Sequence, residues 1–284
     1  MIESFLKRFF TASAIISAAL TSAVFFFLFY FAIPLLENGD LKGLLFSNWE
    51  PDNNVYGIYP MLIASLILAV SSLIISFPIS LGTSFFIVSI APPRLRKIML
   101  YIVRLMTGIP TVVYSFAALF LLVPFMRNVL SHGSGLSLLT AMPVVALLIV
   151  PTMIIFFVNS LTHVSKQSLL AAQSLGASSV QTILYVMLPQ AWPGLLNGIL
   201  LGFGRAIGDT MASLMLAGNS PSVPHSLTDS ARTLTAHIGL VLAFDFDSIE
   251  FKSVFLCGLV LYLTTAILMA IFRMITSLSM TSLK

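Results

Sequence analysis

Residues 162–190 read THVSKQSLLAAQSLGASSVQTILYVMLPQ and separate two long apolar runs. The stretch is too polar to cross a bilayer, but helix-forming apolar residues lie on both sides of Gly176. This pattern predicts two short helices, one over about 169–175 and a second over 180–187 that Pro189 closes. A plain connection between spans fits this pattern, and so does a docking site for a cytosolic protein, which the apolar residues favour.

The overall composition places the chain in a membrane. Of its 284 residues, 58% are hydrophobic and only 8% are charged, whereas soluble domains carry about 25% charged residues. The Lys and Arg residues form no long tract of the kind that binds nucleic acid, so no nucleic-acid partner is expected. Cys257 is the only cysteine, which excludes an intramolecular disulfide. The composition therefore predicts a polytopic protein surrounded by membrane lipid.

Six apolar runs are long enough to cross a bilayer as helices, which takes about 20 residues each. They cover residues 12–36, 59–91, 98–126, 136–161, 192–217 and 252–277. The first run follows Lys7 and Arg8 but is too long for the apolar region of a signal peptide, so we expect a retained span. Pro78 and Gly82 predict a break or bend in the second run, and residues 108–110 predict a kink in the third. The pattern predicts an all-α fold with six transmembrane helices.

The distribution of basic residues orients these spans. If the N-terminus is cytoplasmic, the cytoplasmic segments contain Lys7, Arg8, Arg94, Arg96, Lys97, Lys166, Arg273 and Lys284. The external segments then contain Lys42, Arg127, Arg232 and Lys252. This asymmetry matches the excess of Lys and Arg in cytoplasmic loops. We therefore expect a multi-pass inner-membrane protein with both termini and residues 162–190 in the cytoplasm.

The fifth run contains two charged residues in the stretch GFGRAIGDT, residues 202–210. Arg205 lies near its middle, where an arginine costs about 2.5–3.5 kcal/mol on insertion scales, so it should not face lipid. Asp209 follows four residues later, within reach of a salt bridge on a continuous helix. The pair is therefore expected to lie inside the protein or beside a pathway through it.

A helical wheel divides the fifth run into two sides. One side carries Gly194, Gly198, Gly202, Arg205, Ala206 and Asp209, with Gly208 next to the arginine. The opposite side carries Leu200, Phe203 and Ile207. Glycines at four-residue spacing usually allow close packing of helices. They could also leave room for an ion beside the charged pair, and the two interpretations are compatible.

Residues 162–190 resemble the cytoplasmic loop of permease subunits of ATP-binding-cassette importers, which has the form E-A-A-x3-G-x9-I-x-L-P. The matching residues are Ala171, Ala172, Gly176, Leu188 and Pro189. Leu170 stands in place of the family's Glu, and Val186 stands in place of Ile. The resemblance implies that this loop receives the motion of a cytoplasmic ATPase dimer, with one polar contact removed by the missing Glu.

Three further segments are similar to the transmembrane subunits of phosphate-specific importers. They are MTGIPTVVYSFAALFLLVP (106–124), GFGRAIGDTMASLMLAGNSP (202–221) and ARTLTA (231–236). Segment 202–221 is more similar to the C-type of the two paralogous permeases than to the other, although the family usually has Glu where this chain has Asp209. The resemblance implies a type I importer fold (MetI-like), a heterodimer with a second permease subunit, and an external phosphate-binding protein.

The same resemblance predicts three parts of the chain. Residues 1–56 would form an N-terminal cytoplasmic tail, the first span and an external loop. Residues 57–277 would form the importer domain, with the cytoplasmic coupling loop at 162–190. Residues 278–284 would form a cytoplasmic tail.

Residue chemistry and the resemblance together point to a substrate site at Arg205, Asp209 and Thr210. A guanidinium group can hold phosphate oxygens in bidentate fashion. Inorganic phosphate keeps a proton at neutral pH, so Asp209 can accept a hydrogen bond from it but would repel sulfate. Thr210 can add a hydroxyl donor. Two alternatives stay open for Asp209: a structural salt bridge that pins two helices, and a carboxylate that weakens anion binding so that the anion can leave.

The sequence also bears on functions other than phosphate import. The chain lacks a G-x4-G-K-[ST] phosphate loop, so ATP hydrolysis must come from a partner and the chain itself is not expected to be an enzyme. A permease for molybdate or sulfate is one alternative, and a secondary transporter with Asp209 as a proton relay is another. An intramembrane enzyme ranks last, because the spans contain no nucleophile–base pair. No metal or other cofactor is expected, because no ligand-type spacing connects His132, His163, His225 and His237.

Overall fold

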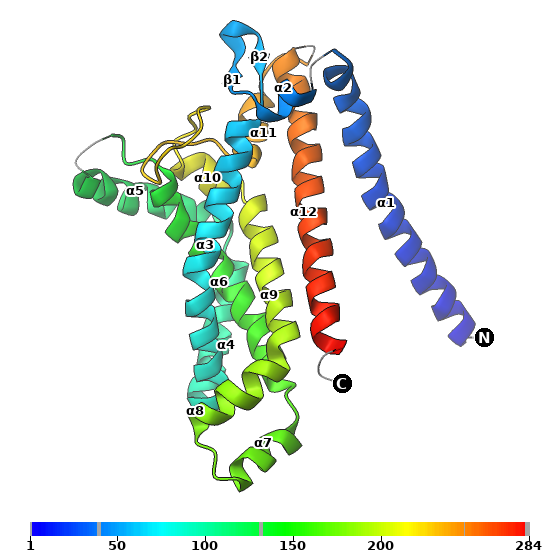
Figure 1. Ribbon diagram of the computed structural model, residues 1–284, viewed down its shortest axis with the longest axis vertical. Helices are drawn as coiled ribbons and strands as arrows, with labels where there is room; N and C mark the ends of the chain where they lie inside the picture. The colour runs from blue at the N-terminus through cyan, green and yellow to red at the C-terminus, as the bar shows by residue number, and fades with distance from the viewer. Residues whose placement is uncertain (1, 39–40, 131–132, 247, 282–284) are drawn as a thin grey trace.

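A computed structural model describes residues 2–38, 41–130, 133–246 and 248–281 as a helical bundle with one short hairpin (Figure 1). Six helices in these ranges are long and apolar enough to cross a membrane. They are Glu3–Leu35, Tyr59–Ile90, Thr111–Leu130, Leu138–Thr162, Ser179–Gly208 and Ile249–Ile275. The predicted all-α class with six candidate spans is therefore confirmed.

The elements follow one another along the chain as a series of helices interrupted by one hairpin. The helices are α1 (Ile2–Asn38), α2 (Leu41–Phe46), α3 (Tyr59–Phe85), α4 (Pro93–Gly108), α5 (Thr111–Leu130), α6 (Leu138–Thr162), α7 (Lys166–Ser174), α8 (Ser179–Thr182), α9 (Leu188–Gly208), α10 (Met211–Leu216), α11 (Leu234–Val241) and α12 (Ile249–Thr281). Strands β1 (Trp49–Glu50) and β2 (Val55–Tyr56) pair antiparallel around a 3-10 turn at Pro51–Asn53. Residues 282–284 of the predicted C-terminal tail lie outside the described residues.

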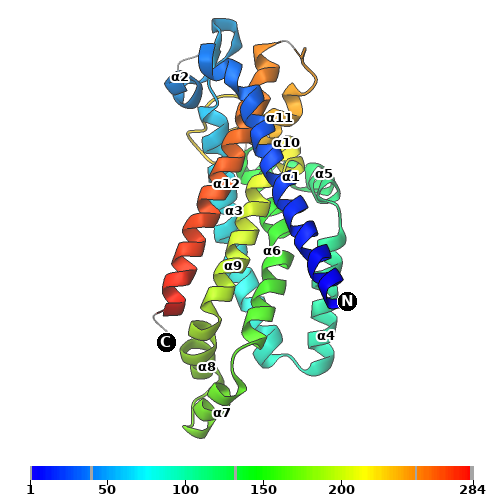
Figure 2. The ribbon, with the colours of Figure 1, turned by 90° about the vertical axis from the view of Figure 1, so that its right-hand side faces the viewer.

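The bundle has two distinct ends. One end carries α7 and α8 and is called the α7–α8 end; the other carries α2, α11 and the β1–β2 hairpin and is called the hairpin end (Figures 1 and 2). Helices α1 and α12 both extend between the hairpin end and the side of the bundle that carries α7 and α8. The N-terminal end of α1 and the C-terminal end of α12 therefore lie on the same side of the bundle, as an even number of spans requires.

Serine hydroxyls join α3 to α6 along the centre of the bundle. The hydroxyl groups of Ser72, Ser80 and Ser84 donate to the main-chain carbonyls of Met142 (3.1 Å), Val150 (3.4 Å) and Ile154 (3.5 Å). Each donor precedes its acceptor by 70 residues, so the two helices run parallel and in constant register. All three serines are buried. Small side chains let two helices approach closely in a membrane, and hydroxyl groups then bond across the interface.

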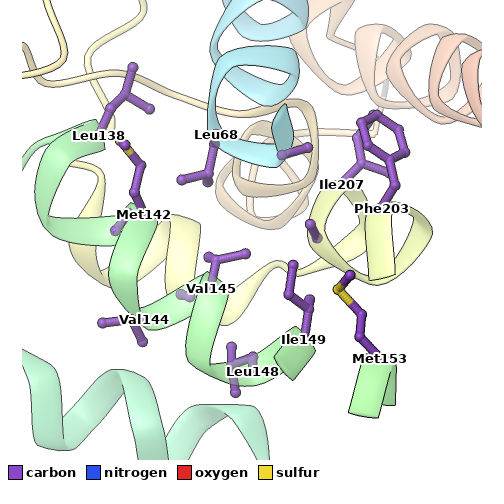
Figure 3. Packing of buried hydrophobic residues seen from close by; sticks show 14 of the residues in the cluster. Leu68, Leu138, Met142, Val144, Val145, Leu148, Ile149, Met153, Phe203 and Ile207 are labelled. Atoms are coloured by element: carbon purple, nitrogen blue, oxygen red, sulfur yellow. The ribbon is translucent and has the colours of Figure 1, made fainter. Parts of the chain in front are cut away.

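The apolar core surrounds this interface. Figure 3 shows Leu68 of α3, Val145 and Ile149 of α6, and Phe203 and Ile207 of α9 in one cluster. All five side chains are buried. The core therefore lies where α3, α6 and α9 meet, and α9 carries the charged residues singled out in the sequence.

Of the predicted break or bend in the second span at Pro78 and Gly82, the break is wrong. Helix α3 continues through both residues, and a π-helical turn at Phe86–Ile90 extends it. Pro78 and Gly82 are exposed on the side of α3 away from the serine contacts. A helix in a membrane tolerates proline when neighbouring groups restrain it, and the bonds from Ser80 and Ser84 to α6 supply that restraint.

The predicted kink in the third run is confirmed, and it is a complete break. Helix α4 ends at Gly108, and Ile109 is extended (φ −76°, ψ 127°) before α5 begins at Thr111. The residue before a proline avoids helical geometry because the proline ring crowds it, which explains the conformation of Ile109 before Pro110. Helix α5 then lies largely across the bundle, while α4 lies along it beside α6 (Figures 1 and 2).

A buried aromatic contact holds the hairpin end together. The rings of Trp49 and His237 pack edge to face with centroids 4.4 Å apart, and the Nε2 atom of His237 lies 3.1 Å from the Ser253 hydroxyl. Burial and, to a lesser extent, the charge of Arg232 lower the pKa of His237 to about 3. The imidazole is therefore neutral at neutral pH, and it connects β1, α11 and α12 without adding a charge.

Replacing Ser72, Ser80 and Ser84 together by Ala should lower the free energy of unfolding by about 2 kcal/mol. The estimate takes about 0.6 kcal/mol for each hydrogen bond between helices in a membrane. Unfolding of the detergent-solubilised protein by SDS measures the effect. Ser71→Ala is the matched control, because the Ser71 hydroxyl bonds only to carbonyls of its own helix among the described residues. Equal stability of the triple variant and this control would contradict the prediction.

Candidate functional site

The charged stretch of the fifth run lies at a break between two helices. Helix α9 ends at Gly208, Asp209 is extended (φ −75°, ψ 118°), and α10 begins at Met211. The prediction of one continuous helix over 192–217 is therefore wrong. Arg205 is still in the last turn of α9, whereas Asp209 lies outside the helix.

Asp209 stabilises the break through both its side chain and its main chain. Its Oδ2 atom accepts a hydrogen bond from the main-chain N–H of Ala212 (2.8 Å) and so caps the first turn of α10. Its main-chain carbonyl accepts bonds from the hydroxyl groups of Ser213 (2.9 Å) and Thr235 (3.1 Å). Polar main-chain groups within a membrane must find partners inside the protein, and the bonds from Ser213 and Thr235 meet that requirement for the Asp209 carbonyl.

Arg205 is held by a neutral partner on α6. Its Nη1 atom donates to the Thr152 hydroxyl at 2.9 Å, and the side chain is half-buried. Within the described part of the chain, no ion pair joins Arg205 to Asp209, and the other guanidinium N–H groups have no protein acceptor. The helix break takes Asp209 out of the i,i+4 position, so the geometry that the sequence allowed for a salt bridge is lost.

The break after α9 faces the break after α4. The side chain of Thr111, the first residue of α5, interacts with the Asp209 carboxylate, and α5 packs against α10. A β-carbon placed on Gly108 or Gly208 would meet no atom within 4 Å. Gly108 and Gly208, at the two helix ends, are therefore both uncovered and exposed.

Thr210 lies beside Asp209 and leads into α10. Its main-chain carbonyl accepts a bond from the Ser213 hydroxyl at 3.0 Å. Its side chain is half-buried, and the described residues offer its hydroxyl no hydrogen-bond partner. Arg205, Asp209 and Thr210 are thus brought together by the end of α9, and each keeps part of its hydrogen-bonding capacity free.

The glycines of α9 divide into two groups with different surroundings. A β-carbon on Gly194, Gly198 or Gly202 would clash with or press on Ser160, Phe157 or Met153 of α6, so the predicted close packing is confirmed. A β-carbon on Gly204 would meet nothing within 4 Å. Phe203 and Ile207, predicted on the opposite side, are buried in the core. Helix α9 is therefore packed on two sides and open along a third.

The loop between α6 and α9 begins with one short helix, α7, as predicted, but the predicted second short helix is the start of the long helix that continues into α9. Gly176 adopts φ +78° after α7, and its N–H bonds to the carbonyl of Gln173 (3.0 Å) while Ala177 bonds to Ala172 (3.0 Å). This pair of bonds is a Schellman motif, which requires a residue with positive φ at that position. Ser178 and Gln181 then form a reciprocal capping box that starts α8. The corner between α7 and α8 is consequently well defined.

Pro189 does not close the second helix of the loop. A π-helical turn at Ile183–Met187 carries α8 directly into α9, and Pro189 lies in the first turn of α9. Proline has no N–H to donate and disturbs the regular α-helical bond pattern, and the π-helical turn directly before it marks that irregularity. Of the other residues matched in the loop, Ala172 is buried, Leu188 is half-buried, and Ala171 and Gly176 are exposed.

Sequence reasoning missed Thr152 and Thr111 as neighbours of the charged pair. Neither was singled out by the sequence patterns, and both are placed by the packing of α6 and α5 around α9 and α10. No cluster of three or more metal-ligating side chains occurs within the described ranges, and His132 lies outside them. Arg232, a half-buried residue outside the spans, donates through Nε to the carbonyl of Asn219 at 3.0 Å.

Asp209→Ala should lower the free energy of unfolding by about 1 kcal/mol, the usual cost of losing a side-chain cap. Asp209→Asn should lower it much less, because the amide oxygen can still accept the Ala212 N–H. Thermal unfolding in detergent measures both variants. Equal destabilisation by Asn and Ala would contradict a capping role and would point to the charge instead.

The chain is similar in sequence and in fold to membrane subunits of bacterial transporters. Residues 84–283 match the family model of binding-protein-dependent transport system inner membrane components. A probable ABC transporter permease, YqgH of Bacillus subtilis, is 32% identical over 273 residues, which cover 94% of this chain and 88% of that protein. The phosphate transport system permease PstC of Xylella fastidiosa is 29% identical over 302 residues, covering 96% and 90%.

Solved structures of low sequence identity share the fold. An inward-facing form of the MetNI methionine ABC transporter has a TM-score of 0.60 at 18% identity, over 76% of this chain and 93% of that chain. A bacterial ABC transporter that imports alginate has a TM-score of 0.59 at 13% identity, over 93% and 95%. The fold is thus that of MetI-type importer permeases. The chain belongs to the family of binding-protein-dependent transport system inner membrane components and is a multi-pass, non-catalytic permease subunit of an ABC transporter.

Proposed function

We propose that this chain is a permease subunit of an ATP-driven importer of inorganic phosphate. It would form the translocation pathway together with a second, paralogous permease subunit. Support for phosphate comes from relatives such as PstC of Xylella fastidiosa, at 29% identity, and from the chemistry of the broken helix. The relatives alone leave room for another oxyanion, so the choice of phosphate depends on the residues of the site.

The surroundings of Arg205 carry the proposal. A guanidinium group lies in the last turn of a membrane-spanning helix, and its bonded partner is the neutral hydroxyl of Thr152. A cation without a bonded counter-charge in such a place is costly and usually serves a function. The unused N–H groups of Arg205 can hold two oxygens of an oxyanion at once, beside the open space next to Gly208.

Asp209 and Thr210 would complete the site and select the substrate. The Oδ2 atom of Asp209 is engaged by α10, but a carboxylate has about four acceptor positions. The remaining positions can accept the proton that phosphate retains at neutral pH. Sulfate has no such proton and would meet only repulsion. The free hydroxyl of Thr210 can donate to another oxygen of the anion.

The α7–α8 end is the proposed docking site for a cytoplasmic ATPase dimer. Apolar side chains there are exposed, including Leu175 (88%, the highest value among the exposed large hydrophobic residues described), Tyr185 (77%) and Val180 (64%). An exposed apolar patch of this kind marks an interaction surface. If the ATPase docks there, the loop 162–190 of the importer domain 57–277 and both termini lie on the cytoplasmic side of the membrane. The hairpin end would then face an external phosphate-binding protein.

Reconstitution of the complete transporter tests the function. Proteoliposomes that contain this chain, its partner permease and the ATPase should accumulate radiolabelled phosphate only when ATP and the loaded binding protein are both supplied. Uptake that continues without ATP would favour the secondary transporter, with Asp209 as a proton relay. ATP-dependent uptake of sulfate or molybdate in preference to phosphate would reassign the substrate.

Asp209→Asn should reduce the preference for phosphate over sulfate about tenfold or more, while ATP-dependent uptake persists. The estimate takes about 1.5–3 kcal/mol for a hydrogen bond to a charged group. Competition between labelled phosphate and unlabelled sulfate in the same proteoliposomes measures the ratio. Thr210→Ser, which keeps the hydroxyl, is the matched control and should leave the ratio unchanged. An unchanged preference for phosphate over sulfate in Asp209→Asn would contradict the selectivity mechanism.

Leu175→Ser should weaken retention of the ATPase without changing the stability of the permease. Because 88% of the Leu175 side chain is exposed, its loss removes little packing within the chain. Co-purification of the ATPase in detergent, with thermal unfolding of the permease alone, separates the two effects. Gln173→Ala is a control at an exposed position in the last turn of α7, two residues before Leu175. Full ATPase retention by Leu175→Ser would contradict the proposed docking site.

A further inference from the structure

Two exposed asparagine side chains lie on α6 and α9, within helices long and apolar enough to cross a membrane. They belong to Asn159 and Asn197, and neither amide group has a hydrogen-bond partner among the described residues. An unsatisfied amide facing hydrocarbon is unfavourable. The surface that carries these two residues therefore faces either water or another polar group.

The two asparagines lie level with each other. Helices α6 and α9 run antiparallel, and their register is fixed by the contact of Gly202 with Met153 and by the bond from Arg205 to Thr152. Asn197 precedes Arg205 by eight residues and Asn159 follows Thr152 by seven, so both lie about 10–12 Å from the bonded pair along the helices. Both displacements point towards the α7–α8 end.

The open faces of the two helices form one surface. On α9, Asn197 lies at most about 80° around the helix from Arg205, with Leu201 and Gly204 exposed between them along the axis. On α6, Asn159 lies about 20° from Thr152. Arg205 bonds to Thr152 across the contact between α9 and α6. The face of α9 that carries Asn197 and the face of α6 that carries Asn159 therefore lie on the same side of this contact.

We propose that Asn159 and Asn197 form a second, uncharged binding station for the transported anion, between Arg205 and the α7–α8 end. This inference rests on the proposed function of Arg205. An amide group offers both N–H donors and a carbonyl acceptor, so two of them can bind an oxyanion in either protonation state. Without a positive charge they hold the anion more weakly than Arg205 does. A pathway needs such a weaker site so that a bound ion can leave.

The reactivity of introduced cysteines tests whether the surface around Asn159 and Asn197 is accessible to water. Asn159→Cys and Asn197→Cys are made in a Cys257→Ser background, which removes the only native cysteine. The assembled, nucleotide-free transporter is treated with a water-soluble anionic thiosulfonate. Both cysteines should react at least about ten times faster than Ile74→Cys, a control at an exposed apolar position of α3 (68%). Rates equal to this control, in a complex that still hydrolyses ATP, would overturn the proposal.

Protection by ligand separates this proposal from the assignment of phosphate. Inorganic phosphate should slow the reaction of both cysteines several-fold. Protection by sulfate or molybdate and not by phosphate would support the station but overturn phosphate as the substrate. Rapid reaction that none of the three anions slows would overturn the station itself, whatever the transporter carries.

Transport kinetics provide a second readout. The double variant Asn159→Leu/Asn197→Leu should lower the maximal rate of phosphate uptake about tenfold and leave the KM for the loaded binding protein unchanged, because the anion has already passed Arg205. Asn159→Gln/Asn197→Gln, which keeps the amides, should restore much of the rate. Loss of the partner permease on purification of the Leu variant would instead identify the asparagines as a contact between subunits and overturn the proposal.

Discussion

The main-chain carbonyl of Asp209 accepts hydrogen bonds from Ser213 and Thr235, and carbonyls of α6 accept bonds from serines of α3. In both places a hydroxyl group and a main-chain carbonyl bond to each other inside the bundle, so the hydroxyl needs no water as its partner. The bonds between α3 and α6 set the register of the central helices. The bonds at Asp209 allow a helix to stop inside the bundle. Without them, the Asp209 carbonyl would lose both hydroxyl partners at the break beside Arg205.

Stopping the helix changes the electrostatics of the site. In a continuous helix, Asp209 would lie one turn from Arg205 and could neutralise it. Here its carboxylate is turned to the N–H of Ala212 and to Thr111, and Arg205 is turned to Thr152. The two charges are neighbours without being paired. Each therefore retains free hydrogen-bonding positions, which a ligand with both acceptor oxygens and a proton can use.

Local patterns in the sequence predicted the features that depend on local chemistry. The number of spans follows from apolar length, the corner at Gly176 from its place between two apolar turns, and the contact of Gly198 with α6 from glycine spacing. The break at Asp209 had a signal as well, since Asp and Thr are common helix-capping residues. An apolar run that continues to Leu216 concealed it.

The features that the sequence did not predict depend on contacts between distant segments. Thr152 and Arg205 lie 53 positions apart in the chain. They meet because α9 packs against α6 at one fixed position along the helix axes. Likewise, α3 continues through Pro78 because serines on its opposite side hold it to α6. Neither outcome follows from periodicity or from intrinsic helix preference, because both are decided by tertiary packing.

Pro189 lies inside a continuous helical segment that bends between α8 and α9 (Figure 1), and this has a mechanical consequence. Residues Ser179–Gly208 form 30 residues of uninterrupted helix, a length of about 45 Å along the helix. One end carries the exposed side chains of Val180 and Tyr185, and the other end lies next to Arg205. A tilt of about 5° around the α8 end would displace Gly208 by about 4 Å, by the same helical dimensions. If this helical segment moves as a unit, a small rotation at its α8 end becomes an ångström-scale movement beside Arg205.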